Sequence, residues 1–438
     1  MDFERKSPAA VLRELSEAAV AYNIENQDSY GGGATWLAEF ESEVASLLGK
    51  EAALFCPSGV MAQLIALKIH ARATTKPSSH TGSVGHRGRG SFLVHGSSHL
   101  LLHEHDAHKE LIELDAVKVG VFERPASFGD LVEALSDGGK REKTKEDSSL
   151  DPPCCFVLEI PHRELGGACT SMNDIKAMSI LLKDQGVAFH CDGARLWEGQ
   201  PFCGESFATI CANFDSAYVS FYKGLGGMTG AMLVGSDSFV AEARVWLRRF
   251  GGNVYTSLPY ALSCLHAFRT QVGTFEGRWH KLKRITSLID KLDYERTASI
   301  TGTTRTSTAD SGFDSVQVDE NEGETSGGGA DAATARGTLV RFEPAVPQCS
   351  MVHCYIQGSQ GELEQARDEV LAEKGVKVFN RLRGTGGAGL YARPGECYFE
   401  WNVGPANGSI EDEVFVEAWA AFLNKIGAGG TSMVDVRY

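Results

Sequence analysis

The sequence predicts an α/β protein in which a large, mostly parallel sheet precedes a small C-terminal α+β unit. Short apolar runs alternate with helix-like stretches through residues 30–275, which is the pattern of consecutive βαβ units. The chain has 438 residues, too many for one small core. Residues 299–337 nearly lack apolar side chains and separate the two parts.

These features divide the chain into five predicted parts. In order they are an N-terminal segment at 1–29, a large α/β domain at 30–275, a connecting helix at 276–298, a disordered insertion at 299–337 and a small α+β domain at 338–438. A basic low-complexity stretch at 73–91 and a charged stretch at 137–153 are expected to form surface loops.

The N-terminal elements are expected to be two helices followed by a strand. Residues 9–21 look helical, and Thr35 can cap a second helix that ends at Gly49. The apolar residues of this second helix fall on one face: Leu37, Phe40, Val44, Leu47 and Leu48. A strand then runs to Phe55, so the second helix is expected to pack on a sheet.

A turn after this strand leads into a long apolar helix from about Val60. A helix that begins at Ser58 and Gly59 offers free backbone N–H groups and a positive dipole end, which suit a phosphate. An ordinary cap by the serine hydroxyl fits the same residues equally well. A phosphate-bearing cofactor would decide between the two.

Two strand-like runs end in reactive side chains. Val187–Cys191 is followed by Asp192, and residues 217–222 are followed by Lys223 and a glycine-rich loop. The carboxyl ends of strands in an α/β sheet line the crevice where ligands bind, so Asp192 and Lys223 are expected to face one site. Taken singly, the aspartate could be only a helix cap and the lysine only a solvated surface residue.

An acid and a lysine in one site suit pyridoxal 5'-phosphate (PLP), with Arg195 three residues beyond the acid. The lysine amine condenses with the cofactor aldehyde. The acid keeps the pyridine nitrogen protonated, so the ring accepts electrons when a bond to the α-carbon of an amino acid breaks. PLP is therefore the cofactor that these residues predict.

Five histidines crowd residues 95–108. No metal site is expected, because HEHDAH has Ala107 where HExxH has its second histidine. His99 is expected to stack on the cofactor ring. Three others are expected on an exposed helix face: His103, His105 and His108. His162, which follows a strand ending at Glu159, could be a base near the site or a loop residue without a role.

The rest of the chain predicts further βα units and a separate terminal unit. The expected elements are a helix at 173–186, a strand at 231–235, helices at 237–253, 259–268 and 278–292, a strand at 351–358, a helix at 362–375, strands at 376–380 and 397–404, and a helix at 411–426.

Composition restricts the partners. The chain has 42 lysine and arginine residues and 57 aspartate and glutamate residues, so its formal net charge is 42 − 57 = −15. This acidic balance argues against nucleic-acid binding and against a polybasic membrane patch. No apolar window reaches membrane-spanning length, and the N-terminus resembles no signal peptide. The 11 cysteines form no CxxC pair, so a reducing, cytoplasmic location is expected, with small molecules and copies of the same chain as partners.

Several stretches closely resemble threonine aldolases and their β-eliminating-lyase relatives, which are PLP enzymes of fold type I. The resemblance runs through residues 30–235 apart from two loops, and its most specific part is FHCDGARLWEG followed by SFYKGLGGMTGAMLVG. It implies a PLP-dependent transferase-like fold with a large PLP-binding domain and a small C-terminal domain. It also implies a homodimer, often paired into tetramers, with shared active sites.

The resemblance implies a role for each matching residue. Lys223 is similar to the lysine that binds the cofactor aldehyde, Asp192 to the partner of the pyridine nitrogen, and Arg195 to the arginine that grips the substrate carboxylate. His99 is similar to the ring-stacking histidine, with Glu104 as a family acid five residues on. The positions similar to the family's phosphate site are Ser58, Gly59 and Val60.

Other positions depart from the family or match it less directly. His162 is similar to a second active-site histidine and Tyr30 to a substrate contact. Tyr255, in GGNVYT, stands where many relatives have an arginine that helps to hold the phosphate. A C-terminal arginine that joins in carboxylate binding has no counterpart in CYFEWNVG, although Arg383 or Arg393 could substitute. These departures bear on the substrate.

The sequence thus predicts a PLP-dependent aldolase that cleaves a threonine-like β-hydroxy-α-amino acid to glycine and an aldehyde. His99, His162 or a water would remove the β-hydroxyl proton. One alternative is β-elimination from a cysteine- or serine-like amino acid by the same lysine and acid. Another, of a different class, is a histidine-rich metal-binding or scaffold protein.

Overall fold

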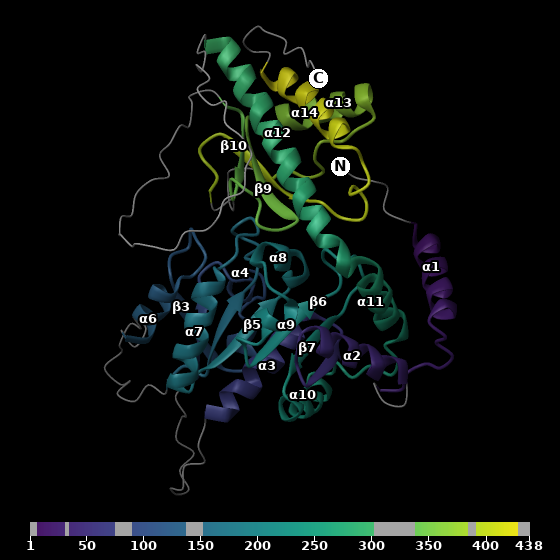
Figure 1. Cartoon of the computed structure of the whole chain (residues 1–438), viewed down its shortest axis with the longest axis vertical. Coiled ribbons are helices and arrows are strands. Elements are labelled where there is room, and N and C mark those ends of the chain that lie inside the picture. The colour runs from purple at the N-terminus through teal and green to yellow at the C-terminus, as the bar shows by residue number, and fades with distance from the viewer. Residues whose placement is uncertain are drawn as a thin grey trace, which may run out of the picture.

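The computed structural model describes residues 7–30, 35–74, 90–136, 152–301, 338–383 and 391–427. They form a seven-stranded sheet and a three-stranded sheet with helices packed on both (Figure 1). The large sheet contains β1 Ala52–Cys56, β2 Gly90–His95, β3 Leu114–Val119, β4 Cys155–Glu159, β5 Ala188–Gly193, β6 Ser216–Ser220 and β7 Ala231–Gly235. The predicted α/β class with a large, mostly parallel sheet is confirmed.

Strand order in the large sheet is β1-β7-β6-β5-β4-β2-β3, so β5 is the central strand. The strands from β3 to β6 pair in parallel, whereas β7 runs antiparallel to both β1 and β6. In register, Glu159 lies beside Asp192 and Asp192 beside Tyr218. Three side chains with polar groups thus lie in a row across the sheet, with Glu159 and Asp192 at the carboxyl ends of β4 and β5 and Tyr218 in the middle of β6.

Helices cover both faces of the large sheet because its strands are apolar on both sides. The helices are α1 Pro8–Ala21, α2 Thr35–Leu47, α3 Gly59–Thr74, α4 His99–Leu102, α5 Ala107–Glu110, α6 Phe128–Ser136, α7 Met172–Gln185, α8 Leu196–Cys203, α9 Phe207–Cys211, α10 Asp237–Arg249, α11 Leu258–Gln271, a 3₁₀ turn at Val272–Thr274, and α12 Phe275–Thr301. The core on one face includes α2, α7, α8 and α11, and the core on the other includes α3 and α10.

The small sheet is antiparallel, in the order β10-β9-β8. Its elements are β8 Val340–Glu343, β9 Met351–Gln357, α13 Gln360–Lys374, β10 Glu396–Asn402 and α14 Asp412–Gly427. The long helix α12 continues from the large unit and packs beside α14 (Figure 1). An aromatic core centred on Trp401 and Trp419 joins this sheet to its helices.

Several predicted boundaries differ from the structure. Strand β6 ends at Ser220, so Lys223 lies in the following loop and does not close the strand. Residues 376–380 form no strand but an irregular segment, in which Val378 and Phe379 are buried. Strand β8 was not predicted, and helix α12 continues to Thr301, three residues into the expected insertion.

The predicted loops lie mostly in parts of the chain outside the described residues: 75–89, 137–151 and 302–337. The domain boundaries at 275 and 338 stay predictions, since α12 contributes to the cores of both units. Among the helices of the described chain, none is long and apolar enough to cross a membrane.

Candidate active site

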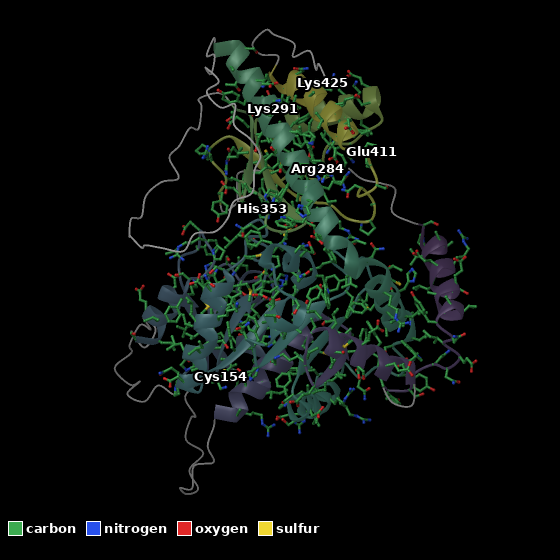
Figure 2. All side chains as sticks on the ribbon, in the orientation of Figure 1. Cys154, Arg284, Lys291, His353, Glu411 and Lys425 are labelled. Atoms are coloured by element: carbon green, nitrogen blue, oxygen red, sulfur yellow. The ribbon has the colours of Figure 1, made fainter. Side chains whose placement is uncertain are left out.

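The carboxyl ends of the parallel strands point toward the small sheet. Figure 2 labels Cys154, which immediately precedes β4, at the far end of the large unit. Asp192 therefore lies at the end of the central strand that faces the small unit. Every residue of β5 after its first is buried, so the strand holds this carboxylate in an apolar setting.

Asp192 is 2% exposed, and its Oδ1 accepts a hydrogen bond of 3.1 Å from the backbone N–H of Ala194. Burial raises the pKa of Asp192 to about 7, and repulsion from Glu159 adds to the rise, while the Lys223 ammonium opposes it. A positively charged partner would stabilise the ionised form of this buried carboxylate. The protonated nitrogen of a pyridine ring would be such a partner.

Lys223 lies in a tight loop beyond β6. The loop is closed by the Gly226 N–H, which donates to the Lys223 carbonyl at 3.0 Å, and by the Gly227 N–H, which donates to the Phe221 carbonyl at 2.8 Å. Gly226 has a φ of +88°, which glycine adopts at little cost. Burial lowers the pKa of Lys223, and the neighbouring Arg195 guanidinium lowers it further. A larger neutral fraction of the amine favours attack on a carbonyl.

The N-terminus of α3 lies on the same face of the sheet as Asp192. A Cβ on Gly59 would come within 2.1 Å of the Tyr218 hydroxyl oxygen, and Tyr218 is the register neighbour of Asp192. The Ser58 hydroxyl accepts a hydrogen bond of 3.3 Å from the N–H of Met61, which is an ordinary cap. Glycine at 59 therefore lets the start of a 16-residue helix approach the strand end closely.

Arg195 and Glu198 form an ion pair at the start of α8, with side chains that are 11% and 2% exposed. The Nη1 group of Arg195 donates to Oε1 and Oε2 of Glu198 at 3.0 and 3.3 Å. The Nε atom of Arg195 is buried and has no hydrogen-bond partner within the described chain. Since buried donors are almost always paired, this N–H is suited to a ligand oxygen.

His99 is oriented by two carboxylates. Its Nδ1 lies 2.9 Å from Oε1 of Glu104, and its backbone N–H donates to Oε2 of Glu159 at 3.2 Å. Glu159 also accepts the backbone N–H of Arg163 at 3.0 Å. The imidazole is thus fixed next to the strand end that carries Asp192, because Glu159 and Asp192 are register neighbours.

His162 is fully buried, and neither of its ring nitrogens has a hydrogen-bond partner among the described residues. Its ring meets His95 edge-on at 4.9 Å between centroids. Burial lowers the pKa of His162 well below its usual value, and the second imidazole adds to this. His162 is therefore a neutral imidazole with unused hydrogen-bonding capacity.

A cavity of about 500 Å³ separates the two sheets beside Lys223. Its wall on the large unit includes Arg195, Glu198 and Lys223, and its wall on the small unit includes Arg383 and Glu400. Sequence reasoning missed both glutamates. The only signal for Glu198 was its place one helical turn after Arg195, and nothing in the sequence marked Glu400.

Glu400 is the centre of a charged cluster on this wall. It pairs with Arg163 of the large unit, and its Oε1 lies 3.6 Å from Nη2 of Arg383 and 4.0 Å from Nε2 of His353. Figure 2 labels His353 on the side of the small unit that faces the large one. Arg393, the other arginine that sequence reasoning considered, does not line this cavity.

Tyr30 and Tyr255 lie away from this cavity. Their rings meet edge-on at 5.4 Å, and the N–H of Tyr30 donates to the carbonyl of Tyr255 at 2.7 Å. Both side chains are exposed, and Tyr30 lines a separate cavity of about 230 Å³ with Arg244. The substrate contact assigned to Tyr30 stays a prediction.

The described residues fit PLP and offer no metal site. A buried carboxylate, a part-buried amine and a helix N-terminus whose close approach requires glycine lie near the same edge of the sheet. They match the pyridine nitrogen, the aldehyde and the phosphate of the cofactor. No group of three or more histidine, cysteine, aspartate or glutamate side chains in the described chain could hold a metal ion.

Comparisons with known proteins show the family of the chain. Residues 7–309 match the family model described as β-eliminating lyase. The chain is 30% identical over 248 residues to the aldolase vrtJ of Penicillium aethiopicum, and the match covers 54% of this chain and 55% of that protein. The chain thus spans just over half the length of this curated relative.

Two solved structures are similar along almost the whole chain. One, assigned as an L-allo-threonine aldolase of Listeria monocytogenes, is 28% identical with a TM-score of 0.71, and the alignment covers 97% of this chain and 95% of that one. The other, assigned as an aromatic amino acid β-eliminating lyase/threonine aldolase of Exiguobacterium, is 26% identical with a TM-score of 0.73 and coverages of 97% and 96%.

Proposed function

Since the chain belongs to the β-eliminating lyase family, a PLP-dependent family that includes threonine-aldolase-like lyases, we propose that it cleaves a β-hydroxy-α-amino acid to glycine and an aldehyde. The observation that carries this proposal is that buried Asp192 and part-buried Lys223 lie close enough to shift each other's pKa, next to an arginine with a buried N–H that has no partner in the described chain. The substrate would be threonine-like.

The residues would divide the work by chemistry. Lys223 would hold the cofactor through its amine, Asp192 would pair with the pyridine nitrogen, and the backbone at Ser58, Gly59 and Val60 would bind the phosphate. When bound, PLP supplies an electron-accepting ring that stabilises the negative charge left on the α-carbon. His99 would pack against that ring, fixed by its contact with Glu104.

Arg195 would bind the α-carboxylate of the substrate. Guanidinium and carboxylate form strong, directional hydrogen bonds, and the unpartnered Nε of Arg195 is available for one of them. This fixes the amino acid relative to Lys223 and aims its side chain into the cavity. Arg383 on the opposite wall would join Arg195 in carboxylate binding, as a substitute for the missing C-terminal arginine.

A base must remove the proton of the β-hydroxyl as the Cα–Cβ bond breaks. The ring nitrogens of His162 have no partner in the described chain, so one of them can accept a proton, and the lowered pKa favours release of that proton afterwards. His99 is already bonded through Nδ1, which leaves Nε2 for the same task. A water held by either imidazole is the third candidate.

β-Elimination is the second candidate function. It is favoured by the Exiguobacterium structure, whose assigned activities combine β-eliminating lyase with threonine aldolase. The same lysine and acid would serve both reactions. Elimination from a cysteine- or serine-like amino acid would leave pyruvate and ammonia, whereas the aldolase reaction leaves glycine and an aldehyde.

We further propose a cytoplasmic homodimer or homotetramer with active sites shared between copies. All 11 cysteines are unpaired, which suits a reducing compartment. The exposed Tyr30 and Tyr255 pair suits an interface between copies, since aromatic side chains are enriched in interface cores. The division at residues 275 and 338 is likewise proposed as the boundary between a cofactor domain and a small domain.

The test of the proposed function is a product assay on the purified protein with PLP. Threonine, allo-threonine, phenylserine, serine and cysteine would be supplied, and glycine, aldehyde, pyruvate and ammonia measured. Glycine and an aldehyde in equal amounts from at least one β-hydroxy amino acid are expected. Pyruvate and ammonia alone would replace the aldolase by the lyase, and no product from any substrate would contradict both.

A further inference from the structure

Glu198 is the most highly connected carboxylate of the candidate site. It is 1% exposed and accepts hydrogen bonds from three separate segments. The partners are Nη1 of Arg195 at 3.0 and 3.3 Å, the backbone N–H of Gly224 at 3.1 Å and the hydroxyl of Ser350 at 3.3 Å. An ion pair alone would need only the first of these contacts.

The bond to Gly224 connects Glu198 with the lysine loop. Gly224 directly follows Lys223, and a Cβ at position 224 would come within 2.7 Å of Oε1 of Glu198. The Gly224 carbonyl in turn accepts a hydrogen bond of 2.7 Å from Nη1 of Arg278. Both backbone polar groups of Gly224 are therefore hydrogen-bonded, and the backbone next to Lys223 has little freedom to shift.

The bond to Ser350 connects Glu198 with the small sheet. Ser350 directly precedes β9, and its carbonyl accepts the N–H of Val403 at 2.9 Å, just beyond β10. Val403 lines the cavity beside Lys223. The same carboxylate thus reaches the arginine, the lysine loop and the opposite wall.

This geometry leaves Arg195 with one side occupied and one side open. Nη1 is held by Glu198, whereas the buried Nε has no partner in the described chain. A guanidinium is planar, so a carboxylate bound on one side fixes the direction in which the other donors point. Without Glu198, the long arginine side chain would sample other rotamers inside the cavity.

Resting on the proposed function, we propose that Glu198 is a positioning residue that fixes Arg195 and the Lys223 loop at one separation. The ligand class that this arrangement selects is then an α-amino acid, recognised through both its carboxylate and its amine. The carboxylate is recognised by Arg195 and the amine is presented at Lys223, and the distance between the two recognition points is set by one shared anion. A ligand with an amine and no carboxylate would depend on Glu198 much less, because the Lys223 loop is also held by Arg278 and by its own backbone hydrogen bonds.

The experiment is a binding titration of the PLP-loaded protein followed by its visible absorbance. Glycine carries both groups, and methylamine carries only the amine. For Glu198→Ala, glycine affinity is expected to fall at least tenfold, while methylamine affinity stays within twofold of the wild type. The matched control is Glu205→Ala, because Glu205 follows the same helix and forms an exposed pair with Lys176. It should leave both affinities unchanged.

Two further variants keep the proposal falsifiable if Glu198→Ala folds poorly. Glu198→Gln keeps the size and one acceptor oxygen, so a smaller loss of glycine affinity is expected than for alanine. In an Arg195→Ala background, adding Glu198→Gln should lower glycine affinity by less than twofold, because Arg195 is already gone and the glutamine oxygen can still accept the Gly224 N–H. Thermal unfolding of each variant reports on the fold.

Unchanged glycine affinity in both Glu198 variants would overturn the proposal. Equal losses for glycine and methylamine would also overturn it, since they indicate general damage, and so would a full additional loss in the Arg195→Ala background. Failure of the proposed function is separate, because it is detected from the products that the wild-type protein forms, whereas this proposal is tested by ligand binding to the variants.

Discussion

The two walls of the active-site cavity are built in different ways. The wall on the large sheet holds Asp192 and Lys223, whose pKa values are shifted toward neutral by burial. The wall on the small sheet holds Glu400 and Arg383, which neutralise each other and lie near further charges. Ionisable groups with shifted pKa values and few charge partners are typical of catalytic sites, whereas paired charges typically fix the shape and selectivity of a site. The large sheet is therefore expected to determine the rate and the small sheet the choice of substrate.

The largest effect is expected for a change in the large-sheet wall, which holds Asp192 and Lys223. Asp192→Asn keeps the shape but cannot carry the charge that pairs with a protonated pyridine nitrogen. We expect kcat/KM to fall about 100- to 1,000-fold, the range for loss of one electrostatic stabiliser. The control is Asp184→Asn, at an exposed position near the end of α7, and it should leave kcat/KM unchanged. A small effect of Asp192→Asn would remove the distinction between the walls.

The next effect concerns the start of α3. Gly59→Ala would place a methyl group 2.1 Å from the Tyr218 hydroxyl oxygen, so either the helix or the tyrosine must move. PLP affinity, measured by absorbance after ultrafiltration, is expected to weaken by about tenfold or more, since one tenfold step corresponds to about 1.4 kcal/mol. Gly277→Ala, in α12 with open space around it, is the control and should bind PLP normally. Unchanged affinity in Gly59→Ala would place the phosphate elsewhere.

A third effect is the pH dependence of stability in the cofactor-free protein. The folded-state pKa of Asp192 is raised from 3.8 to about 7, so the folded protein binds more protons than the unfolded chain between these values. Stability contributed by this group is therefore present at low pH and is lost as pH rises through that window, by on the order of a few kcal/mol. Asp192→Asn should be less sensitive to pH between 4 and 7, measured by urea unfolding. Equal slopes in both proteins would contradict the raised pKa.

The smallest effect is expected on the small-sheet wall. Glu400→Gln leaves Arg163 and Arg383 without their shared carboxylate, in a partly exposed cluster. We expect a loss of about 1 kcal/mol in stability and a change in KM of roughly threefold, with kcat nearly constant. The exposed Glu369→Gln is the control. A loss of kcat comparable to that of Asp192→Asn would give both walls a catalytic role.

The large-sheet wall was predictable because the ends of buried strands can be recognised in the sequence. A continuous apolar run stops at Asp192, and a second run is followed by Lys223 and glycines, so both side chains could be assigned to one sheet edge. The extent of the second strand was wrong, since residues 221 and 222 are apolar or aromatic but already belong to the loop. The class of the fold followed from the same alternation.

The opposite wall was not predictable because it depends on contacts between distant segments. Glu400 lies in β10 and pairs with Arg163, which follows β4. Glu198, on a helix, resembles a surface residue until its bonds to Gly224 and Ser350 are seen. The expected strand at 376–380 was wrong for a related reason, because its consecutive apolar residues Val378 and Phe379 are buried in the core of the small unit from an irregular segment.

The central claim is a covalent link between PLP and the amine of Lys223, and its most direct test is borohydride reduction followed by peptide mass mapping. Reduction makes the link stable, so the peptide containing Lys223 should carry the mass of reduced PLP, and the visible absorbance of the protein should disappear. In the Lys223→Ala variant, no peptide should carry reduced PLP, and borohydride should cause no such loss of absorbance. Label on another lysine, or none on a protein that binds PLP, would contradict the account.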